Sequence, residues 1–204
     1  MSVDLSLLHD LNAFFFRHDF VEDPLVFYAN AAEALFLGLL VAAFVLVRGH
    51  RRRGARRAVV AAGLSAGVAL AIAQVLSRVV DRPRPFVADP GGIHLFAQHA
   101  PDPGFPSDHA TAAFAIAVAI LLRHRGWGAV TLVAAFLLAI GRVGMGIHYP
   151  SDVLAGAALG SACALALWHP RARAVLHALA DLAGRVLDAT TAAVGARIGL
   201  PPRI

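Results

Sequence analysis

The chain has 204 residues, of which 58% are hydrophobic and only 15% are charged, and its mean hydropathy is +0.68. Soluble globular domains carry about 25% charged residues, so this composition excludes an ordinary soluble domain and indicates an integral membrane protein. All 18 basic residues are arginine, and the formal net charge is +5. The arginines gather at the ends of hydrophobic segments, where membrane topology requires them, so we expect no nucleic-acid partner.

The first 24 residues mix apolar and acidic side chains, which is typical of a short amphipathic helix at a membrane interface. Asp23-Pro24 marks its expected end. A cleavable signal peptide is not expected, because acidic residues stand where a basic n-region is needed. Residues 25–47 follow as the first hydrophobic segment, and they are long enough to cross a bilayer core of ~30 Å.

Six arginines crowd the segment 48–57, before the second hydrophobic segment at residues 58–76. Such a cluster is either a patch for anionic lipids or a topology signal. We prefer the topology signal, because short Arg-rich loops between hydrophobic segments stay on the cytoplasmic side.

Three more hydrophobic segments follow, at residues 109–122, 128–140 and 153–168, and each is shorter than the ~20 residues of a spanning helix. We therefore expect their flanks to be helical as well. The predicted fold is all-α: one membrane-embedded domain, 1–204, forming a helical bundle of about five to six transmembrane helices. Residues 174–204 are predicted to form an amphipathic C-terminal tail.

The alternation of segments predicts the topology. If 48–57 is cytoplasmic, the Arg-bearing links 123–127 and 169–173 are cytoplasmic too, and the N-terminus, the Pro-rich connection 77–108 and the link 141–151 lie on the opposite face. Arginines on that face go against the positive-inside rule and need another reason to be there. They are Arg78, Arg82, Arg84 and Arg142.

Three polar clusters fall on this opposite face although they are distant in sequence. They are residues 78–86 (RVVDRPRPF), residues 105–109 (FPSDH) and residues 141–152, where Gly141-Arg142 is followed after five residues by HYPSD. Ionisable side chains near membrane depth are costly, so their convergence indicates a functional site. Arginines offer planar, permanently charged donors that match phosphate oxygens, which favours a phosphate substrate.

The spacing of the histidines favours nucleophilic chemistry. His148 and Asp152 are four residues apart, so on a helix they share a face, and Pro150 suits a helix start. Asp152 would accept the proton of one imidazole nitrogen and leave the other free to attack. His109 would protonate the leaving oxygen, while Ser107 and the backbone N–H groups at the start of the third helix would hold an anion.

Two other interpretations compete with this one. His109, His148, Asp108 and Asp152 offer ligands for a metal ion, but the arginines would repel a metal and attract phosphate directly. We therefore predict no metal and no cofactor. Alternatively these residues only cap helices and reach the interface. That explains any one of them, but it explains poorly why all three clusters share a face.

The motifs resemble those of the type 2 phosphatidic acid phosphatase superfamily, which also includes bacterial acid phosphatases and vanadium haloperoxidases. Its motifs are Lys, six residues, Arg-Pro; then Pro-Ser-Gly-His; then Ser-Arg, five residues, His, three residues, Asp. Matching positions here are Arg84-Pro85 in the first, Pro106, Ser107 and His109 in the second, and Arg142, His148 and Asp152 in the third. The motifs cover residues 77–152, and the resemblance implies a haloperoxidase-like membrane bundle without a metal.

The resemblance also implies a role for each matching residue. They are His148 as a nucleophile that forms a phosphohistidine, Asp152 as its orienting partner, His109 as general acid, and Arg84, Arg142 and Ser107 as phosphate ligands. Three positions depart from the family pattern. Ser77 replaces the first-motif Lys, with Arg78 one residue later as a candidate substitute; Gly141 replaces the third-motif Ser; and Asp108 replaces Gly beside the phosphate site.

The combination FPSDHA, RPRPF and HYPSD is similar to the undecaprenyl-diphosphate phosphatase branch, the bacitracin-resistance type. We therefore expect hydrolysis of a polyprenyl diphosphate lipid at the extracytoplasmic face of the plasma membrane. Phosphatidic acid and phosphatidylglycerophosphate phosphatases use the same chemistry and remain alternatives. A haloperoxidase is disfavoured because so apolar a chain suits a lipid substrate. A non-enzymatic lipid binder or transporter is the remaining class.

The topology leads to a first prediction. Single cysteines introduced as Gly54→Cys and Gly92→Cys are labelled in intact cells with a membrane-impermeant thiol reagent. Only Cys introduced at Gly92 should be marked, because residues 77–108 are expected outside and 48–57 inside. Labelling at the Gly54 position instead would invert the predicted orientation.

Overall fold

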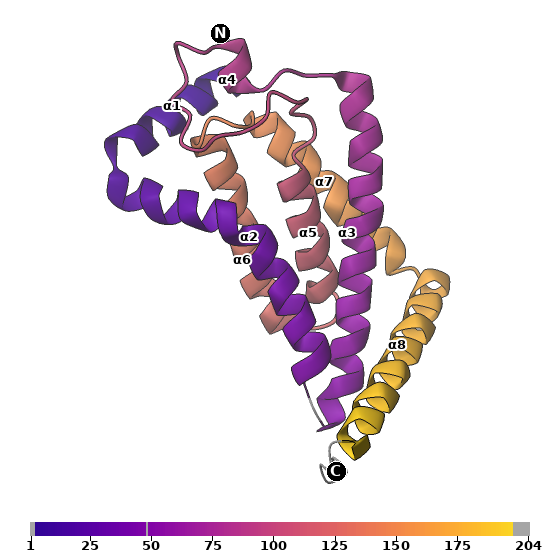
Figure 1. Cartoon of the computed structure of the whole chain (residues 1–204). Helices are drawn as coiled ribbons and strands as arrows, with labels where there is room; N and C mark the ends of the chain where they lie inside the picture. Colours follow the sequence, from indigo (N-terminus) through magenta and orange to yellow (C-terminus); the bar gives the residue numbers. More distant parts are fainter. Residues whose placement is uncertain (1–2, 48, 198–204) are drawn as a thin grey trace.

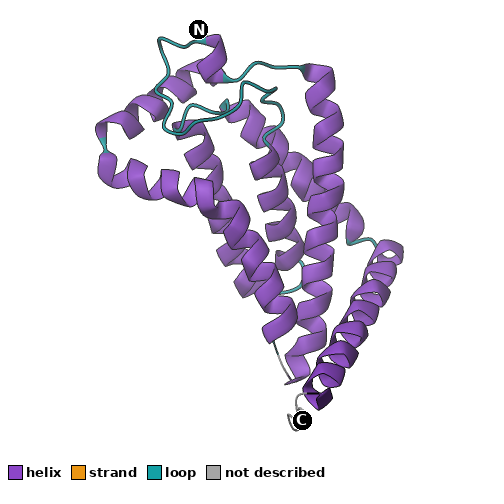
Figure 2. Ribbon diagram, viewed as in Figure 1, coloured by secondary structure: helices purple, strands orange, loops and turns teal. Residues whose placement is uncertain are grey.

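A computed structural model describes residues 3–47 and 49–197, and within these ranges every regular element is helical (Figures 1 and 2). The elements are α1 (Val3–Arg17), α2 (Asp19–Leu46), the 3₁₀ turn η1 (Gly49–Arg51), α3 (Arg52–Val80), α4 (Pro85–Ala88), α5 (Asp108–Leu121), α6 (Arg125–Gly144), α7 (Pro150–Leu167) and α8 (Pro170–Arg197). The predicted all-α class is confirmed.

Helix α5 lies at the centre of the bundle, in contact with α3, α6 and α7, while α2 packs on α3 and α6 (Figure 1). Helix α1 crosses one end of the bundle, and α8 runs beside the N-terminal part of α3 at the other. Four segments, containing α2, α3, α6 and α7, are long and apolar enough to cross a membrane, and α5 is a fifth apolar helix of 14 residues. These five agree with the predicted count.

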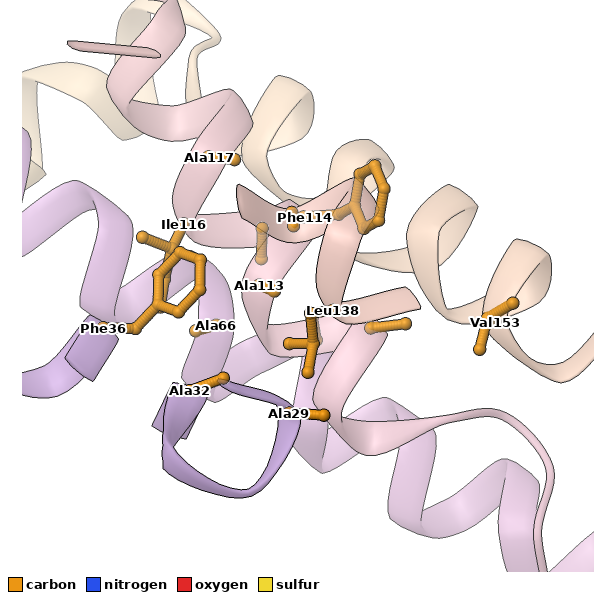
Figure 3. Close-up of a cluster of buried hydrophobic side chains, with 14 of the residues drawn as sticks. Ala29, Ala32, Phe36, Ala66, Ala113, Phe114, Ile116, Ala117, Leu138 and Val153 are labelled. Carbon is orange, nitrogen blue, oxygen red and sulfur yellow. The ribbon is translucent and has the colours of Figure 1, made fainter. Parts of the chain in front are cut away.

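The core is built mainly from small residues. Ala29 and Ala32 of α2, Ala66 of α3 and Ala113 and Ala117 of α5 are buried where these helices meet (Figure 3). Larger side chains from three helices, Phe36, Ile116 and Leu138, fill the space between them. Because lipid tails are as apolar as leucine, helices in a membrane associate through close packing, and small residues permit it. The bulky apolar side chains therefore lie largely on the outside, toward lipid.

Helices α5 and α7 approach each other closely. A Cβ added at Gly156 would lie 2.6 Å from the Ser107 carbonyl oxygen, and one added at Gly160 would overlap the Thr111 carbonyl. The two glycines are one helical turn apart on α7, so they form a flat strip against the first turns of α5. This strip sets the distance between the start of α5, which carries Ser107 to His109, and the start of α7, which carries Asp152.

Several predicted boundaries are wrong. Asp23-Pro24 does not end a helix, because α2 begins at Asp19 and continues through Pro24. Proline costs one backbone hydrogen bond, and long membrane helices tolerate that loss when neighbouring groups compensate. The Arg-rich segment 48–57 is mostly helical, since α3 begins at Arg52. The link after the fourth segment is also shorter than predicted, because α6 continues through Gly144.

The expectation of helical flanks holds for α6 and α7 but not for α5, which ends at Leu121. The amphipathic tail is helical from Pro170 to Arg197, and residues 198–204 lie outside the described part of the chain. The links after α3 and α6 lie at one end of the bundle, and η1 lies at the other (Figure 1). Helix α8 starts partway along the bundle and runs toward the end that bears η1.

The glycine strip leads to a prediction. Gly160→Val would force α7 away from the Thr111 backbone, and overpacking of this kind costs ~1–3 kcal/mol. We expect a lower Tm and a lower kcat/KM, because the two helix starts would separate. Gly63→Val is the matched control, since a Cβ at Gly63 meets no atom within 4 Å. Equal losses in both variants would contradict a specific role for the strip.

Candidate active site

The three polar clusters meet at one cavity of about 310 Å³. It lies where the C-terminal end of α3, the start of α5, the end of α6 and the link before α7 converge. Its lining residues are Gln74, Ser77, Arg78, Arg84, His99, Asp102, Pro103, Pro106, Asp108, His109, Arg142 and His148. The structure thus brings together both predicted histidines and all three predicted arginines.

His148 is held by one bond to each ring nitrogen and is only 2% exposed. Its Nδ1 lies 3.0 Å from the Gly104 carbonyl oxygen, and its Nε2 lies 3.1 Å from Nη1 of Arg84. A carbonyl only accepts and a guanidinium only donates, so Nδ1 carries the proton and Nε2 carries the lone pair. The unprotonated ring nitrogen therefore faces Arg84, and it is the one that can act as a nucleophile.

Asp152 does not bind His148 as the four-residue spacing predicted. The Asp152 Oδ2 to His148 Nδ1 distance is 3.7 Å, and helix α7 begins only at Pro150, so His148 precedes the helix. Instead, Asp152 accepts the Tyr149 backbone N–H at 2.8 Å and Nη1 of Arg82 at 2.7 Å. The carboxylate fixes the turn that carries His148, while the Gly104 carbonyl orients the ring.

Asp4 and Arg82 complete this support, and neither was predicted as a site residue. Arg82 donates to Asp152 and, through Nη2 at 2.7 Å, to Asp4. Asp4 also accepts the backbone N–H of Ser151 at 2.9 Å and its hydroxyl at 2.6 Å. The guanidinium of Arg82 lies 3.9 Å from the centre of the Tyr149 ring. No local pattern could reveal Asp4, because its partners are 78 and 147 residues away.

Arg84 and Arg142 are both buried at the cavity. Arg84 donates through Nε to Asp102, at 3.0 Å to the carboxylate. Nη2 of Arg142 lies 3.1 Å from Nε2 of His99, and the buried Nε of Arg142 has no hydrogen-bond partner among the described residues. Buried guanidinium donors are normally satisfied, so this Nε is available to a ligand oxygen. His99 and Asp102 were missed because they lie in an irregular, Pro-rich connection.

The start of α5 holds the second cluster. Ser107 is the N-cap residue, completely buried, and its hydroxyl accepts the Ala110 N–H at 3.5 Å. It is not among the lining residues, although its backbone N–H donates to the Asp152 carbonyl at 3.1 Å. Asp108 accepts from Nε2 of Gln74 at 2.9 Å and lines the cavity beside His109.

Two departures from the family motifs can now be located. Arg78 is exposed at the wall of the cavity, on the last turn of α3. Gly141 faces away from the site, because an added Cβ would lie 3.2 Å from that of Ala29 in α2. A serine hydroxyl at this position would point at α2, so glycine removes nothing from the cavity here.

The electrostatics of the cavity favour a neutral nucleophile and an anionic ligand. Burial, with the charges of Arg142 and Arg84, holds the pKa of His148 well below its usual value. Burial also lowers the pKa of His99. The Asp102 side chain is largely exposed; desolvation acts to raise its pKa, but its bonds to Arg84 hold the pKa below the usual range.

Potential metal ligands do not gather in the described residues: no three His, Cys, Asp or Glu side chains lie close enough together to hold an ion. The positive charge at the cavity comes instead from Arg78, Arg84 and Arg142. The prediction that no metal takes part rests on these arginines and remains a prediction.

Comparisons with known proteins identify the family. The family model described as the PAP2 superfamily matches residues 58–175, more than half of the chain. The chain belongs to the PAP2 superfamily. It is 32% identical to undecaprenyl-diphosphatase BcrC of Bacillus subtilis, over 68% of this chain and 69% of that protein. It is 30% identical to the bacitracin transport permease protein BcrC of Bacillus licheniformis, over 87% of this chain and 88% of that protein.

Two solved structures share the fold of this chain. LpxE of Aquifex aeolicus superposes with a TM-score of 0.62 and 24% identity, covering 81% of this chain and 94% of that one. A transmembrane PAP2-type phosphatidylglycerolphosphate phosphatase of Bacillus subtilis superposes with a TM-score of 0.59 and 19% identity, covering 82% of this chain and 85% of that one. The family match and the relative named undecaprenyl-diphosphatase make this PAP2 protein an enzyme of the lipid phosphate phosphatase class, which sets aside the non-enzymatic binder or transporter. Its apolar helices and the shared fold make it a multi-pass membrane protein.

The pKa of His148 leads to a prediction. Only neutral imidazole attacks, and the lowered pKa keeps His148 neutral as the pH falls below the usual ~6.5. Activity limited by His148 is therefore lost only at lower pH. Arg142→Gln removes a nearby positive charge, so the acid limb of kcat/KM should move to higher pH. Arg171→Gln, on the exposed start of α8, is the control and should leave it in place. An unmoved limb in Arg142→Gln would contradict the electrostatic account.

Proposed function

We propose that this PAP2 phosphatase hydrolyses a polyprenyl diphosphate, most specifically undecaprenyl diphosphate, to the monophosphate and inorganic phosphate. The main support is the pairing of Nε2 of buried His148 with Arg84 in a cavity that also holds Arg142. The relatives named undecaprenyl-diphosphatase, including the putative enzyme YbjG of Escherichia coli at 45% identity over 38% of each chain, support the substrate.

The reaction proceeds in two steps. Nε2 of His148 attacks the terminal phosphorus, the P–N bond forms, and the bond from phosphorus to the bridging oxygen breaks. His109 gives a proton to the departing monophosphate. Water, deprotonated by His109, then attacks the phosphohistidine, releasing inorganic phosphate and restoring the neutral imidazole.

The remaining residues stabilise charge and hold the nucleophile. Arg84 and Arg142 contact the equatorial phosphate oxygens, where preorganised donors stabilise the transition state. Arg78, at the wall, meets the second phosphate of a diphosphate. Asp108 and Ser107 position the first turn of α5 toward the ligand. Asp152 acts on His148 through the Tyr149 backbone N–H.

The site is proposed to face the extracytoplasmic side of the plasma membrane, at the end of the bundle opposite the Arg-rich start of α3. A lipid diphosphate has its head at the interface and its tail among the helices, so a hydrolytic cavity suits the ends of spanning segments. This activity would recycle the lipid carrier of peptidoglycan synthesis and thereby oppose bacitracin.

Phosphatidylglycerophosphate hydrolysis is the second candidate, favoured by the structural likeness to the Bacillus subtilis enzyme. The test is phosphate release by the purified protein, in EDTA, from undecaprenyl diphosphate, phosphatidylglycerophosphate, phosphatidic acid and lipid A. The highest kcat/KM should be on undecaprenyl diphosphate. A preference for another lipid would replace the substrate, and activity that requires added metal would overturn the mechanism.

Substitution of His148 and of His109 should reduce activity to different extents on different substrates. His148→Ala should abolish turnover and any phosphohistidine, because it removes the attacking nitrogen. His109→Ala removes general acid catalysis, which is worth about 10²–10⁴-fold. Its loss should be smaller on a diphosphate, whose leaving group is a phosphate monoester, than on a monophosphate ester, whose leaving group is an alkoxide. Asp152→Asn should fall between the two.

The measurement is kcat/KM for each variant on both substrates, with a rapid-quench search for phosphohistidine. If phosphohistidine formed in His148→Ala but not in His109→Ala, His109 would be the nucleophile and His148 the general acid.

A further inference from the structure

A second cavity, of about 460 Å³, lies at the end of the bundle opposite the catalytic one. It is formed by η1, the first turns of α3 and the middle of α8, and we call it the basic cavity. Its lining residues are Gly49, His50, Arg52, Arg53, Arg56, Ala180, Asp181, Gly184, Arg185 and Asp188. None of these residues takes part in the chemistry described above.

Hydrogen bonds and ion pairs hold one wall of the basic cavity in place. Arg56 is only 6% exposed, and it donates to the Gly184 carbonyl at 3.1 Å and to both carboxylate oxygens of Asp188, at 3.0 and 2.8 Å. A Cβ added at Gly184 would lie 2.8 Å from Nη1 of Arg56, so a larger residue there would displace this guanidinium. Arg52 also binds Asp188. These contacts fix α8 against α3 and hold the cavity open.

The positive charge of the basic cavity exceeds what its acids neutralise. Four arginines line it against two aspartates, and Asp181 is already bound by Arg57 from outside the lining, at 2.7 Å. Arg53 and Arg185 make no hydrogen bond or close ion pair with any residue in the described ranges, although their charges act on the Asp181 carboxylate. The buried Nε of Arg52 has no hydrogen-bond partner there. Guanidinium donors of this kind match phosphate oxygens.

The basic cavity adjoins apolar surface that faces lipid. Leu46 at the end of α2 and Val186 on α8 are 64% and 56% exposed, and the Phe44 ring lies 5.1 Å from the Arg56 guanidinium. A ligand that carries a phosphate and apolar chains therefore fits better than a free ion. A topology signal would require only the positive charge of the arginines. It would not require Asp188 on α8, which orients Arg52 and Arg56.

We propose that the basic cavity binds the phosphate of an anionic phospholipid head group, with the acyl chains lying against α2 and α8. Basic pockets between helices at a membrane surface bind such head groups. Arg53 and Arg185 contact the phosphate oxygens, while Arg56 and Asp188 keep the wall in place.

The test measures binding to the full-length protein in nonionic detergent, with short-chain phosphatidylglycerol as the probe. Phosphatidylcholine and inorganic phosphate form parallel arms. The variant Arg53→Gln/Arg185→Gln should weaken phosphatidylglycerol binding on the order of tenfold. The matched control, Arg51→Gln/Arg171→Gln, removes two arginines at the same end that do not line the cavity and should bind as the wild type does. All variants keep the catalytic cavity, so any binding there is the same in each. Only the difference in affinity between the variants reports on the basic cavity.

Retained phosphatase activity shows that the variants are folded, and Arg185→Glu, which reverses one exposed charge, should weaken binding further than Arg185→Gln. Equal affinity in the wild type and the double variant would overturn the proposal. Binding of phosphatidylcholine as tight as that of phosphatidylglycerol would overturn the requirement for an anionic head group. Displacement of the lipid by an equal concentration of inorganic phosphate would overturn the lipid as ligand.

Discussion

The buried carboxylate of Asp152 organises the end of the protein that holds the candidate active site. A buried carboxylate is costly unless it is paired and hydrogen-bonded, and Asp152 meets both conditions through Arg82 and the Tyr149 N–H. Its backbone carbonyl accepts the N–H of Ser107. One residue therefore joins all three polar clusters. Removing any partner would leave a charge or a backbone group unsatisfied in an environment with little water.

The same network explains why a terminal helix belongs to the site. Helix α1 buries Leu8 and Phe15 in the apolar core, and its Asp4 binds both Arg82 and Ser151. The pair of Arg82 and Asp152 is already neutral, so Asp4 gives the Arg82 guanidinium a second acceptor and ties it to Ser151. Arg82 thus serves the framework, while Arg84, two residues later, lies at the cavity beside His148.

Helix α3 links two sites built on the same physical principle. At its C-terminal end, arginines line the catalytic cavity, and at its N-terminal end they line the basic cavity. In each case an aspartate from another segment, Asp102 or Asp188, pairs with one or two lining arginines and leaves other donors for a ligand. The low dielectric near a bilayer strengthens both the pairing and the attraction to phosphate. The alanine-rich middle of α3 carries no such charges and serves close packing.

The sequence by itself determined the class of protein, the approximate spanning segments and most of the residues at the cavity. Apolar length and arginine placement follow from the bilayer, and the motif spacing identified Arg84, His109, Arg142 and His148. Predictions from the spacing of residues failed where a contact depends on how the backbone turns between them. His148 lies before α7 rather than on it, so the predicted bond to Asp152 is replaced by the Gly104 carbonyl.

Only the tertiary structure revealed Asp4, His99 and Asp102, since each acts through partners from other elements and none lies in a local pattern. It also turned the Arg-rich segment from a predicted loop into one wall of a cavity, because the other wall comes from α8, more than a hundred residues away. Local chemistry decides which side chains are costly to bury. The folding of the chain decides which distant groups satisfy them.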